Sequence, residues 1–222
     1  MGEGNPPMTV GQSAWGIALG SVLLASVLLT SGCSPESDAT VDDLESLSIE
    51  SSGLGSCTVS AEIEYNGARA LVTALHCVGD NAYVDAPSLS ARLPVIERFD
   101  AYDLALLQPL ESIRLPSYPV AAFPASGVEA CKVGTLVKND CGPVVGPGEV
   151  DGTVVMMIDI CSVPGDSGSA ITWNGTLVGV EGGDVSYAPG FDENLPCNSV
   201  EQSRMNPLYS LGLPEAVIGS AP

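Results

Sequence analysis

Gly165-Asp166-Ser167-Gly168 is the stretch of this sequence that says most about its fold. A serine hydroxyl is a poor nucleophile at neutral pH and needs an adjacent base to react. Glycines on both sides of the serine permit a tight turn with positive φ angles. Such a turn lets the N–H groups of Gly165 and Ser167 point at one spot, where they can hold a negatively charged oxygen. The stretch alone also fits an ordinary turn, so its interpretation depends on the rest of the chain.

Two further motifs precede this turn. His76, the one histidine of the chain, lies in Thr73-Ala74-Leu75-His76-Cys77, and Asp103 lies in Tyr102-Asp103-Leu104-Ala105-Leu106. An imidazole takes up a proton near neutral pH, and a carboxylate beside it fixes its tautomer. In the order His, Asp, Ser, these motifs resemble those of the trypsin-like, chymotrypsin-fold serine peptidases. The resemblance implies His76 as general base, Asp103 as its orienting partner, Ser167 as nucleophile, and an oxyanion hole at Gly165 and Ser167.

The folded part of the chain reads as all-β. From Cys57 onward, short apolar runs are separated by Gly, Pro, Asn and Asp, a pattern typical of sandwiches and barrels. Asn206-Pro207 predicts the start of a short helix that ends at Gly212. The resemblance implies two six-stranded antiparallel Greek-key barrels, chymotrypsin-like, with a short C-terminal helix. The predicted strands are 61–65, 70–74, 83–86, 94–99, 105–108, 133–137, 153–160, 170–173 and 177–181.

The N-terminal region indicates export. Residues 15–30 form an apolar run that is shorter than the roughly 18 residues expected of a spanning helix and suits a secretory signal. The run ends at Leu29-Thr30-Ser31-Gly32-Cys33, which is similar to a bacterial lipobox, where the peptide is cut before a cysteine that carries lipid. We therefore expect a signal peptide over 1–32 and a lipidated Cys33. The protein would then be exported and lipid-anchored in the bacterial cell envelope. The alternatives are an ordinary secretory signal, which would give a secreted protein, and an uncleaved anchor.

The composition and the motifs together divide the remainder of the chain. Residues 33–56 carry the lipidated cysteine and are acidic and rich in serine, which predicts a flexible tether. Residues 57–115 would form the first barrel, with the histidine and the aspartate. Residues 116–222 would form the second barrel, with the nucleophilic serine and a C-terminal segment.

Charge and donor residues exclude some classes of partner. The formal net charge is −20 and no Lys or Arg precedes Arg69, which argues against nucleic acid because phosphate binding needs basic clusters. One histidine and the absence of a Cys-x-x-Cys motif argue against a zinc site. We expect no metal and no cofactor, a polypeptide substrate, a membrane contact through the lipid anchor, and a monomer.

Seven cysteines fit an exported protein. If Cys33 carries lipid, six remain, and an oxidising compartment permits disulfides among them. Within the family, the closest resemblance is to the bacterial branch that includes α-lytic protease and the streptogrisins. That resemblance implies the pairing Cys57–Cys77, Cys131–Cys141 and Cys161–Cys197.

The same branch suggests how the nucleophile turn is held. Mammalian members use a freed amino terminus as partner for the aspartate before the nucleophile, whereas bacterial members use a basic residue after the first cysteine of a bridged hairpin. Lys132 occupies that place, so the resemblance implies that it pairs with Asp166 and supports the oxyanion loop. The specificity pocket would be lined by two segments, one before the nucleophile and one after it: Ser162, Val163 and Pro164, and Val180, Glu181, Gly182 and Gly183.

The leading functional prediction is an exported serine endopeptidase that works through an acyl-enzyme. A catalytically inactive trypsin-like protein-binding module is the alternative, and an esterase would use the same chemistry on another substrate. The order of the three motifs disfavours an α/β-hydrolase, in which the serine comes first.

Overall fold

The computed structural model describes residues 42–51, 53–134, 140–150, 152–184 and 208–219. Strands dominate these ranges, and the helical elements within them are short. No helix among the described residues is long and apolar enough to cross a membrane. The predicted signal peptide and Cys33 lie outside the described residues.

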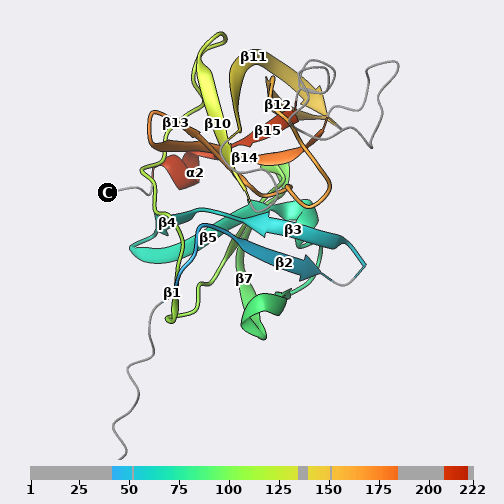
Figure 1. Cartoon of the computed structure of the whole chain (residues 1–222), viewed down its shortest axis with the longest axis vertical. Helices are drawn as coiled ribbons and strands as arrows, with labels where there is room; N and C mark the ends of the chain where they lie inside the picture. Colours follow the sequence, from blue (N-terminus) through green and yellow to red (C-terminus); the bar gives the residue numbers. More distant parts are fainter. Residues whose placement is uncertain (1–41, 52, 135–139, 151, 185–207, 220–222) are drawn as a thin grey trace, which may run out of the picture. The chain divides into compact units, whose positions relative to one another are not determined.

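The first half of the folded region is a seven-stranded sheet in the order β3-β2-β6-β7-β8-β5-β4 (Figure 1). Neighbouring strands are antiparallel throughout. The sheet curls so that β5 comes close to the edge strand β3. A hydrogen bond of 3.0 Å from Thr73 Oγ1 in β5 to the Thr58 carbonyl in β3 joins the two strands. Its strands are β2 (Leu47–Ser51), β3 (Gly55–Val59), β4 (Glu62–Tyr65), β5 (Ala68–Ala74), β6 (Tyr83–Ala86), β7 (Ala91–Phe99) and β8 (Leu104–Leu107).

The second half is a closed barrel in the order β10-β11-β12-β15-β14-β13. A short helix, α2 (Glu215–Ile218), follows the last strand. The strands are β10 (Glu129–Val133), β11 (Asp140–Val150), β12 (Thr153–Ile158), β13 (Ala170–Trp173), β14 (Thr176–Asp184) and β15 (Leu208–Gly212).

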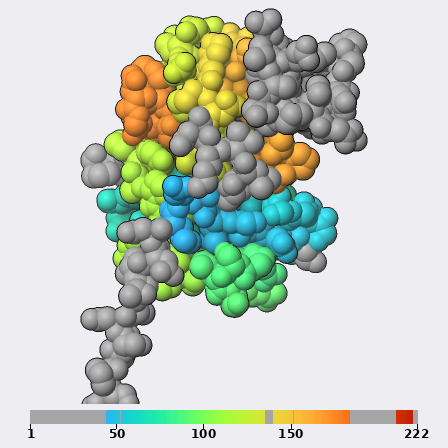
Figure 2. All heavy atoms as spheres, in the orientation of Figure 1, coloured from blue at the N-terminus to red at the C-terminus, as the bar shows by residue number. Residues whose placement is uncertain are grey.

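The remaining elements are one strand pair and three 3₁₀ turns. β1 (Asp42–Asp43) runs parallel to β9 (Ile113–Arg114). In the space-filling view, β2 and β3 (blue) lie between the green residues of the first sheet and the yellow and orange residues of the barrel (Figure 2). β5 is the strand of the first sheet that contacts a barrel strand, β14, most extensively among the described residues. The turns are η1 (Leu75–Cys77), η2 (Pro87–Leu89) and η3 (Asp100–Tyr102).

The apolar core joins the two halves. One cluster of buried residues extends from the first sheet, for example Leu71 and Leu106, to Val180 and Leu211 in the barrel. A smaller cluster fills the rest of the barrel and includes Ile158. Because burial of apolar surface is the main favourable term in folding, this shared core stabilises the two halves together.

The predicted fold class is confirmed: the chain is all-β, with two curved β units and a short C-terminal helix. The first unit differs in detail, since it is a sheet of seven strands rather than a six-stranded barrel.

Three local predictions are corrected. The tether was predicted to reach residue 56, but β2 belongs to the first sheet, because Leu47 and Ile49 alternate with polar residues and are buried. The helix predicted to end at Gly212 is instead strand β15, which pairs with both β12 and β14 and closes the barrel. Tertiary pairing overrides the local helix signal there. The predicted strand 133–137 is shifted as well: β10 ends at Val133, and 135–139 lie outside the described residues.

Candidate active site

Strand register brings His76 and Asp103 together. β5 and β8 pair in antiparallel register with Ala74 opposite Leu104. The chain leaves β5 into η1, which carries His76, while Asp103 immediately precedes β8. The Leu75 N–H donates to the Asp103 carbonyl at 2.7 Å, which extends the ladder by one step. Two residues far apart in sequence are thus placed side by side.

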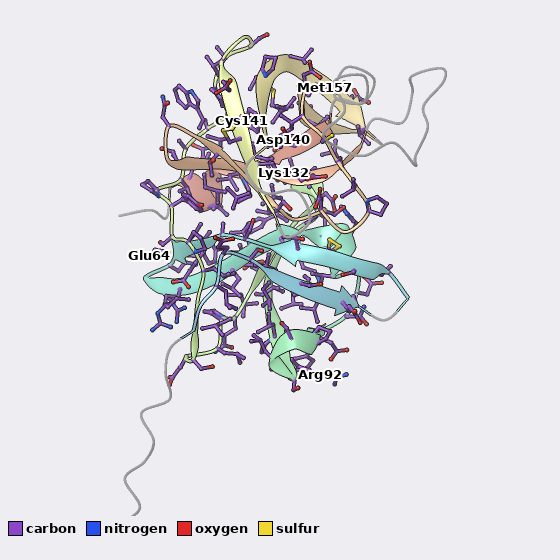
Figure 3. All side chains as sticks on the ribbon, viewed as in Figure 1. Glu64, Arg92, Lys132, Asp140, Cys141 and Met157 are labelled. Atoms are coloured by element: carbon purple, nitrogen blue, oxygen red, sulfur yellow. A yellow bond between two sulfur atoms is a disulfide. The ribbon has the colours of Figure 1, made fainter. Side chains whose placement is uncertain are left out.

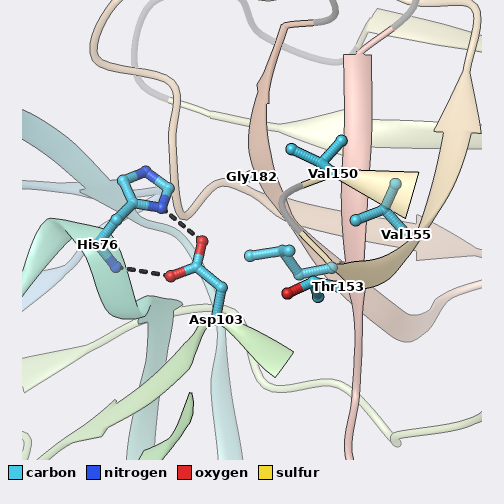
Figure 4. Close-up of a pocket in the computed structure, with 7 residues that line it drawn as sticks. His76, Asp103, Val150, Thr153, Val155 and Gly182 are labelled. Atoms are coloured by element: carbon cyan, nitrogen blue, oxygen red, sulfur yellow. Dashed lines mark hydrogen bonds and ion pairs between the residues drawn. The ribbon is translucent and has the colours of Figure 1, made fainter. Parts of the chain in front are cut away.

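The Asp103 carboxylate binds His76 at two points. Asp103 Oδ2 lies 2.6 Å from Nδ1 of the imidazole, and Oδ1 accepts the His76 backbone N–H at 2.8 Å (Figure 4). Asp103 adopts a left-handed backbone conformation with φ of 47°, which is uncommon for a residue other than glycine and is enriched for aspartate. With Nδ1 facing the carboxylate, the other ring nitrogen, Nε2, is available to a nucleophile.

The serine lies in a tight turn between Cys161 and β13. Gly165 and Gly168 have φ angles of 102° and 87°, which favour glycine. The Ser169 N–H donates to the Asp166 carbonyl at 2.8 Å, and the Asp166 N–H donates to the Val163 carbonyl at 3.0 Å. Within the described part of the chain, the N–H groups of Gly165 and Ser167 donate to no carbonyl. These two donors are therefore free to bind an oxyanion.

One strand of the first sheet anchors both halves of the site. Cys57 in β3 forms a disulfide with Cys77, the neighbour of His76. The next residue, Thr58, donates its N–H to the Ser167 carbonyl at 2.8 Å. Its Oγ1 donates to the Gly165 carbonyl at 2.7 Å. The histidine and the serine are thus tied to consecutive residues of β3.

Close packing at Gly168 reinforces this junction. A Cβ at this position would overlap the Thr58 carbonyl and Thr73 Oγ1, both in the first sheet. The positive φ and the close approach of backbone together require glycine immediately after the serine.

A pocket of about 370 Å³ lies beside the imidazole. His76 and Asp103 form one side of it, and Val150, Val155 and Thr153 from the β11–β12 hairpin lie opposite (Figure 4). Gly182 and Leu211 also line it. A concave site lined by both polar and apolar groups, next to a group that can accept protons, is typical of a binding site for an organic substrate.

Beneath the turn lies a buried ion pair. Lys132 Nζ is 2.5 Å from Asp166 Oδ2 and 2.5 Å from the Cys161 carbonyl oxygen. Both charged side chains are completely buried, and Lys132 lies inside the barrel (Figure 3). Because a buried charge without a partner is very costly, this pair ties the turn at residues 165–168, the proposed nucleophile turn, to β10.

A second carboxylate, which the sequence did not indicate, shares this cation. Glu181 Oε2 lies 3.2 Å from Lys132 Nζ, and its Oε1 accepts a hydrogen bond from Ser162 Oγ. Burial raises the pKa of Glu181 from 4.5 to about 7, although the Lys132 ammonium and the Ser162 hydroxyl both lower it. Glu181 therefore changes charge near neutral pH.

Similarity of this chain to known proteins is found in structure but not in sequence. No family model matches the chain, and no curated protein matches it in sequence. Solved structures do match: an α-lytic protease homolog, N4, is 17% identical with a TM-score of 0.57, over 80% of this chain and 97% of its own. A glutamic-acid-specific serine protease is 17% identical with a TM-score of 0.56, over 74% and 90%. A Nocardiopsis protease is 18% identical with a TM-score of 0.54, over 77% and 93%.

The chain has the chymotrypsin fold. At identities below one fifth, the likeness extends to the arrangement of strands, and the chemistry has to be argued from the residues of this chain.

Within this chymotrypsin fold, the residues predicted for the specificity pocket lie in different environments. Gly182 lines the pocket beside His76. Val180 belongs to the shared core, and Glu181 and Ser162 are buried against each other. The other three are not fully buried: Val163 and Gly183 are half-buried, and Pro164 is exposed.

Two of the predicted disulfides are confirmed. Cys57 pairs with Cys77, and Cys131 pairs with Cys141 at the paired ends of β10 and β11. Cys161 is also disulfide-bonded, and its predicted partner Cys197 lies outside the described residues. Two groups of side chains place sulfur near possible metal donors, but their cysteines are oxidised, and a metal ligand has to be a thiolate.

The role of Thr58 and most of the residues that line the pocket were not predicted from the sequence. No local motif marks Thr58, because its role depends on β3 lying against the turn from the other half of the fold. Val150, Val155 and Leu211 come from three strands, so the pocket exists only after the barrel closes.

Proposed function

We propose that this protein is a serine endopeptidase that hydrolyses peptide bonds through Ser167, His76 and Asp103. The observation that carries the proposal is the anchoring of the histidine and the serine to Cys57 and Thr58, consecutive residues of β3, with Asp103 bound to the far side of the imidazole.

The proposed mechanism follows from this geometry. Ser167 Oγ attacks the substrate carbonyl carbon, and His76 Nε2 takes the hydroxyl proton because Nδ1 is engaged by Asp103. The carbonyl oxygen becomes an oxyanion, which the N–H groups of Gly165 and Ser167 bind. His76 then gives the proton to the leaving amine, and an acyl-enzyme remains on Ser167. Water, deprotonated by His76, hydrolyses the ester in the reverse sense.

The pocket beside the imidazole suggests how the substrate is held. Its lining combines polar groups with the apolar side chains of Val150, Val155 and Leu211, so we propose that it takes a side chain of a polypeptide. The solved structures of similar fold include proteins described as serine proteases, which supports the same class of reaction here.

Hydrolysis assays on the purified folded domain test the proposal. We expect the protein to digest casein and the Ser167→Ala variant to leave it intact. Hydrolysis of small esters without hydrolysis of casein or of a peptide library would favour an esterase. Inactivity on both, with a folded domain, would favour the binding-module alternative.

We also propose that the protein is exported and tethered to a membrane through lipid on Cys33, with the acidic residues that follow as a flexible tether. The Cys57–Cys77 and Cys131–Cys141 disulfides support export, since such bonds persist in oxidising compartments. The native protein should partition into detergent, and Cys33→Ser should remain in the aqueous phase. Intact-mass analysis that shows an unmodified Cys33 would contradict the anchor.

A further inference from the structure

Two carboxylates and one ammonium group are buried together beneath the nucleophile turn. Lys132 contacts both Asp166 and Glu181, and all three side chains are fully buried. If every group is ionised, the cluster carries one uncompensated negative charge. A net charge in a buried site is costly, and the site can remove it by binding one proton.

Unsatisfied oxygens point to where that proton binds. Asp166 Oδ1 and Glu181 Oε2 have no hydrogen-bond partner among the described residues. Asp166 Oδ2, by contrast, accepts a hydrogen bond from Lys132 at 2.5 Å. Because its distance is longer, 3.2 Å, the Lys132–Glu181 ion pair is weaker than the Lys132–Asp166 ion pair. The proton therefore belongs on Glu181.

Lys132 and Asp166 are the charged neighbours of Glu181 among the described residues. Lys132 comes from β10 and Asp166 from the turn. Neighbours from the other elements are uncharged: Ser162 precedes the turn, Ser169 precedes β13, and Ser210 lies opposite in β15. Protonation of Glu181 thus changes the charge of the cluster directly.

Glu181 is joined through its backbone to the nucleophile turn. Its carbonyl accepts the Gly168 N–H at 2.8 Å, and its N–H donates to the Ser169 carbonyl at 2.8 Å. Gly168 follows Ser167, and Gly182, next to Glu181, lines the pocket with His76. A change at Glu181 is therefore transmitted to the serine through two hydrogen bonds.

We propose that Glu181 is a positioning residue that makes the oxyanion hole of this chain proton-dependent: the neutral carboxyl supports the hole, and the ionised carboxylate weakens it. The inference rests on the proposed function. An ionised Glu181 competes with Asp166 for Lys132, and it also places negative charge behind donors that have to bind an oxyanion. The peptidase would then be most active while this buried carboxyl keeps its proton.

The pH dependence of kcat/KM for a peptide substrate tests the role. The wild-type rate should fall as pH rises and Glu181 ionises. Relative to pH 7, we expect the wild type to fall about tenfold at pH 9, and Glu181→Gln to fall less than about twofold. The matched control is Glu129→Gln, which alters an exposed carboxyl on the same strand as Lys132 and should keep the wild-type profile.

A second variant keeps the proposal falsifiable if Glu181→Gln does not fold. Ser162→Ala removes a hydroxyl donor that favours the ionised carboxylate, so the falling limb should move to higher pH. An unchanged limb in either variant overturns the proposal.

A readout without catalysis separates this proposal from the proposed function. In the Ser167→Ala protein labelled with ¹³C at glutamate carboxyls, one resonance should titrate near pH 7 and be absent from the Glu181→Gln double variant. If the protein hydrolyses no peptide but this resonance titrates near pH 7, the proposed function fails and the buried switch survives. If the Glu181 resonance titrates below pH 5, the switch is overturned whatever the activity.

Discussion

Two aspartates, one in each half of the fold, hold partners in opposite environments. Asp103 and His76, on the first sheet, have side chains that are 26% and 41% exposed. Asp166 and Lys132, in the barrel, are both completely buried. Exposed pairs contribute little to stability, whereas breaking a buried pair is strongly destabilising. The first pair is accessible to substrate and solvent protons, and the second holds a turn in place.

The largest expected effect concerns activity at the exposed pair. His76→Ala should lower kcat/KM by about 10⁴-fold or more, because it removes the proposed general base. Its unfolding free energy should change little, since the imidazole and its partner Asp103 are both partly exposed. Peptide hydrolysis and urea unfolding of the same preparation measure both. A loss of only a few-fold in kcat/KM would contradict the assignment of the base.

The buried pair should show the reverse pattern, with stability and activity lost together. Lys132→Met leaves the buried Asp166 carboxylate without its cation and should cost about 3–5 kcal/mol of unfolding free energy. It should also abolish hydrolysis, because the turn loses its support. The matched control is Arg92→Met, which breaks an exposed pair with Asp85 on the outside of the first sheet (Figure 3). Equal stability of the two variants would show that the buried contact supports nothing.

Much of this contrast was visible in the sequence. Short motifs give the order of His76, Asp103 and Ser167 and the position of Lys132 after Cys131. Through the family resemblance, these motifs predict the fold class and the pairing of Lys132 with Asp166. Strands with a strong local pattern, such as β6 and β13, were predicted with their observed bounds.

The remaining features depend on contacts between distant segments. β2 is hidden in an acidic stretch, and its two buried side chains are recognisable only when the sheet forms. Glu181 was read as part of a pocket wall, because a sequence does not reveal that an ammonium group from β10 lies beside it. The contact of Thr58 with Gly165 and the pocket beside His76 likewise form only where separate strands meet.

Glu181, the carboxyl that shares Lys132 with Asp166, makes the stability of the folded protein depend on pH. Burial raises the pKa of Glu181 to about 7, so the folded state binds this proton more tightly than the unfolded state, where the ordinary value is 4.5. The resulting stabilisation is complete below pH 4.5 and is lost as pH rises through about 7, a difference of roughly 3 kcal/mol.

Glu181→Gln should therefore lack that loss of stability. Urea unfolding at pH 4.5 and pH 8 should give the wild type a fall in unfolding free energy that the variant does not share. Glu129→Gln, with its exposed side chain, again serves as the control and should follow the wild type. If Glu181→Gln and the wild type change in parallel, Glu181 is ionised throughout, and the cluster binds no proton.

The smallest effect is expected where the two regions meet. Thr58→Val removes the hydroxyl that donates to the Gly165 carbonyl and should cost about 1 kcal/mol. Because that hydrogen bond helps to orient the turn, kcat should fall while KM stays near the wild-type value. Thr58→Ser keeps the hydroxyl and should restore kcat. A change confined to KM would place Thr58 in substrate binding rather than in positioning.

The most direct test of the central claim is the site of covalent labelling by a fluorophosphonate probe. An activated serine attacks phosphorus and displaces fluoride, whereas an ordinary serine hydroxyl does not react. We expect one adduct at pH 7, mapped by peptide mass analysis to Ser167, and its loss in His76→Ala. An unlabelled folded protein, or an adduct on another serine such as the buried Ser169, would contradict it.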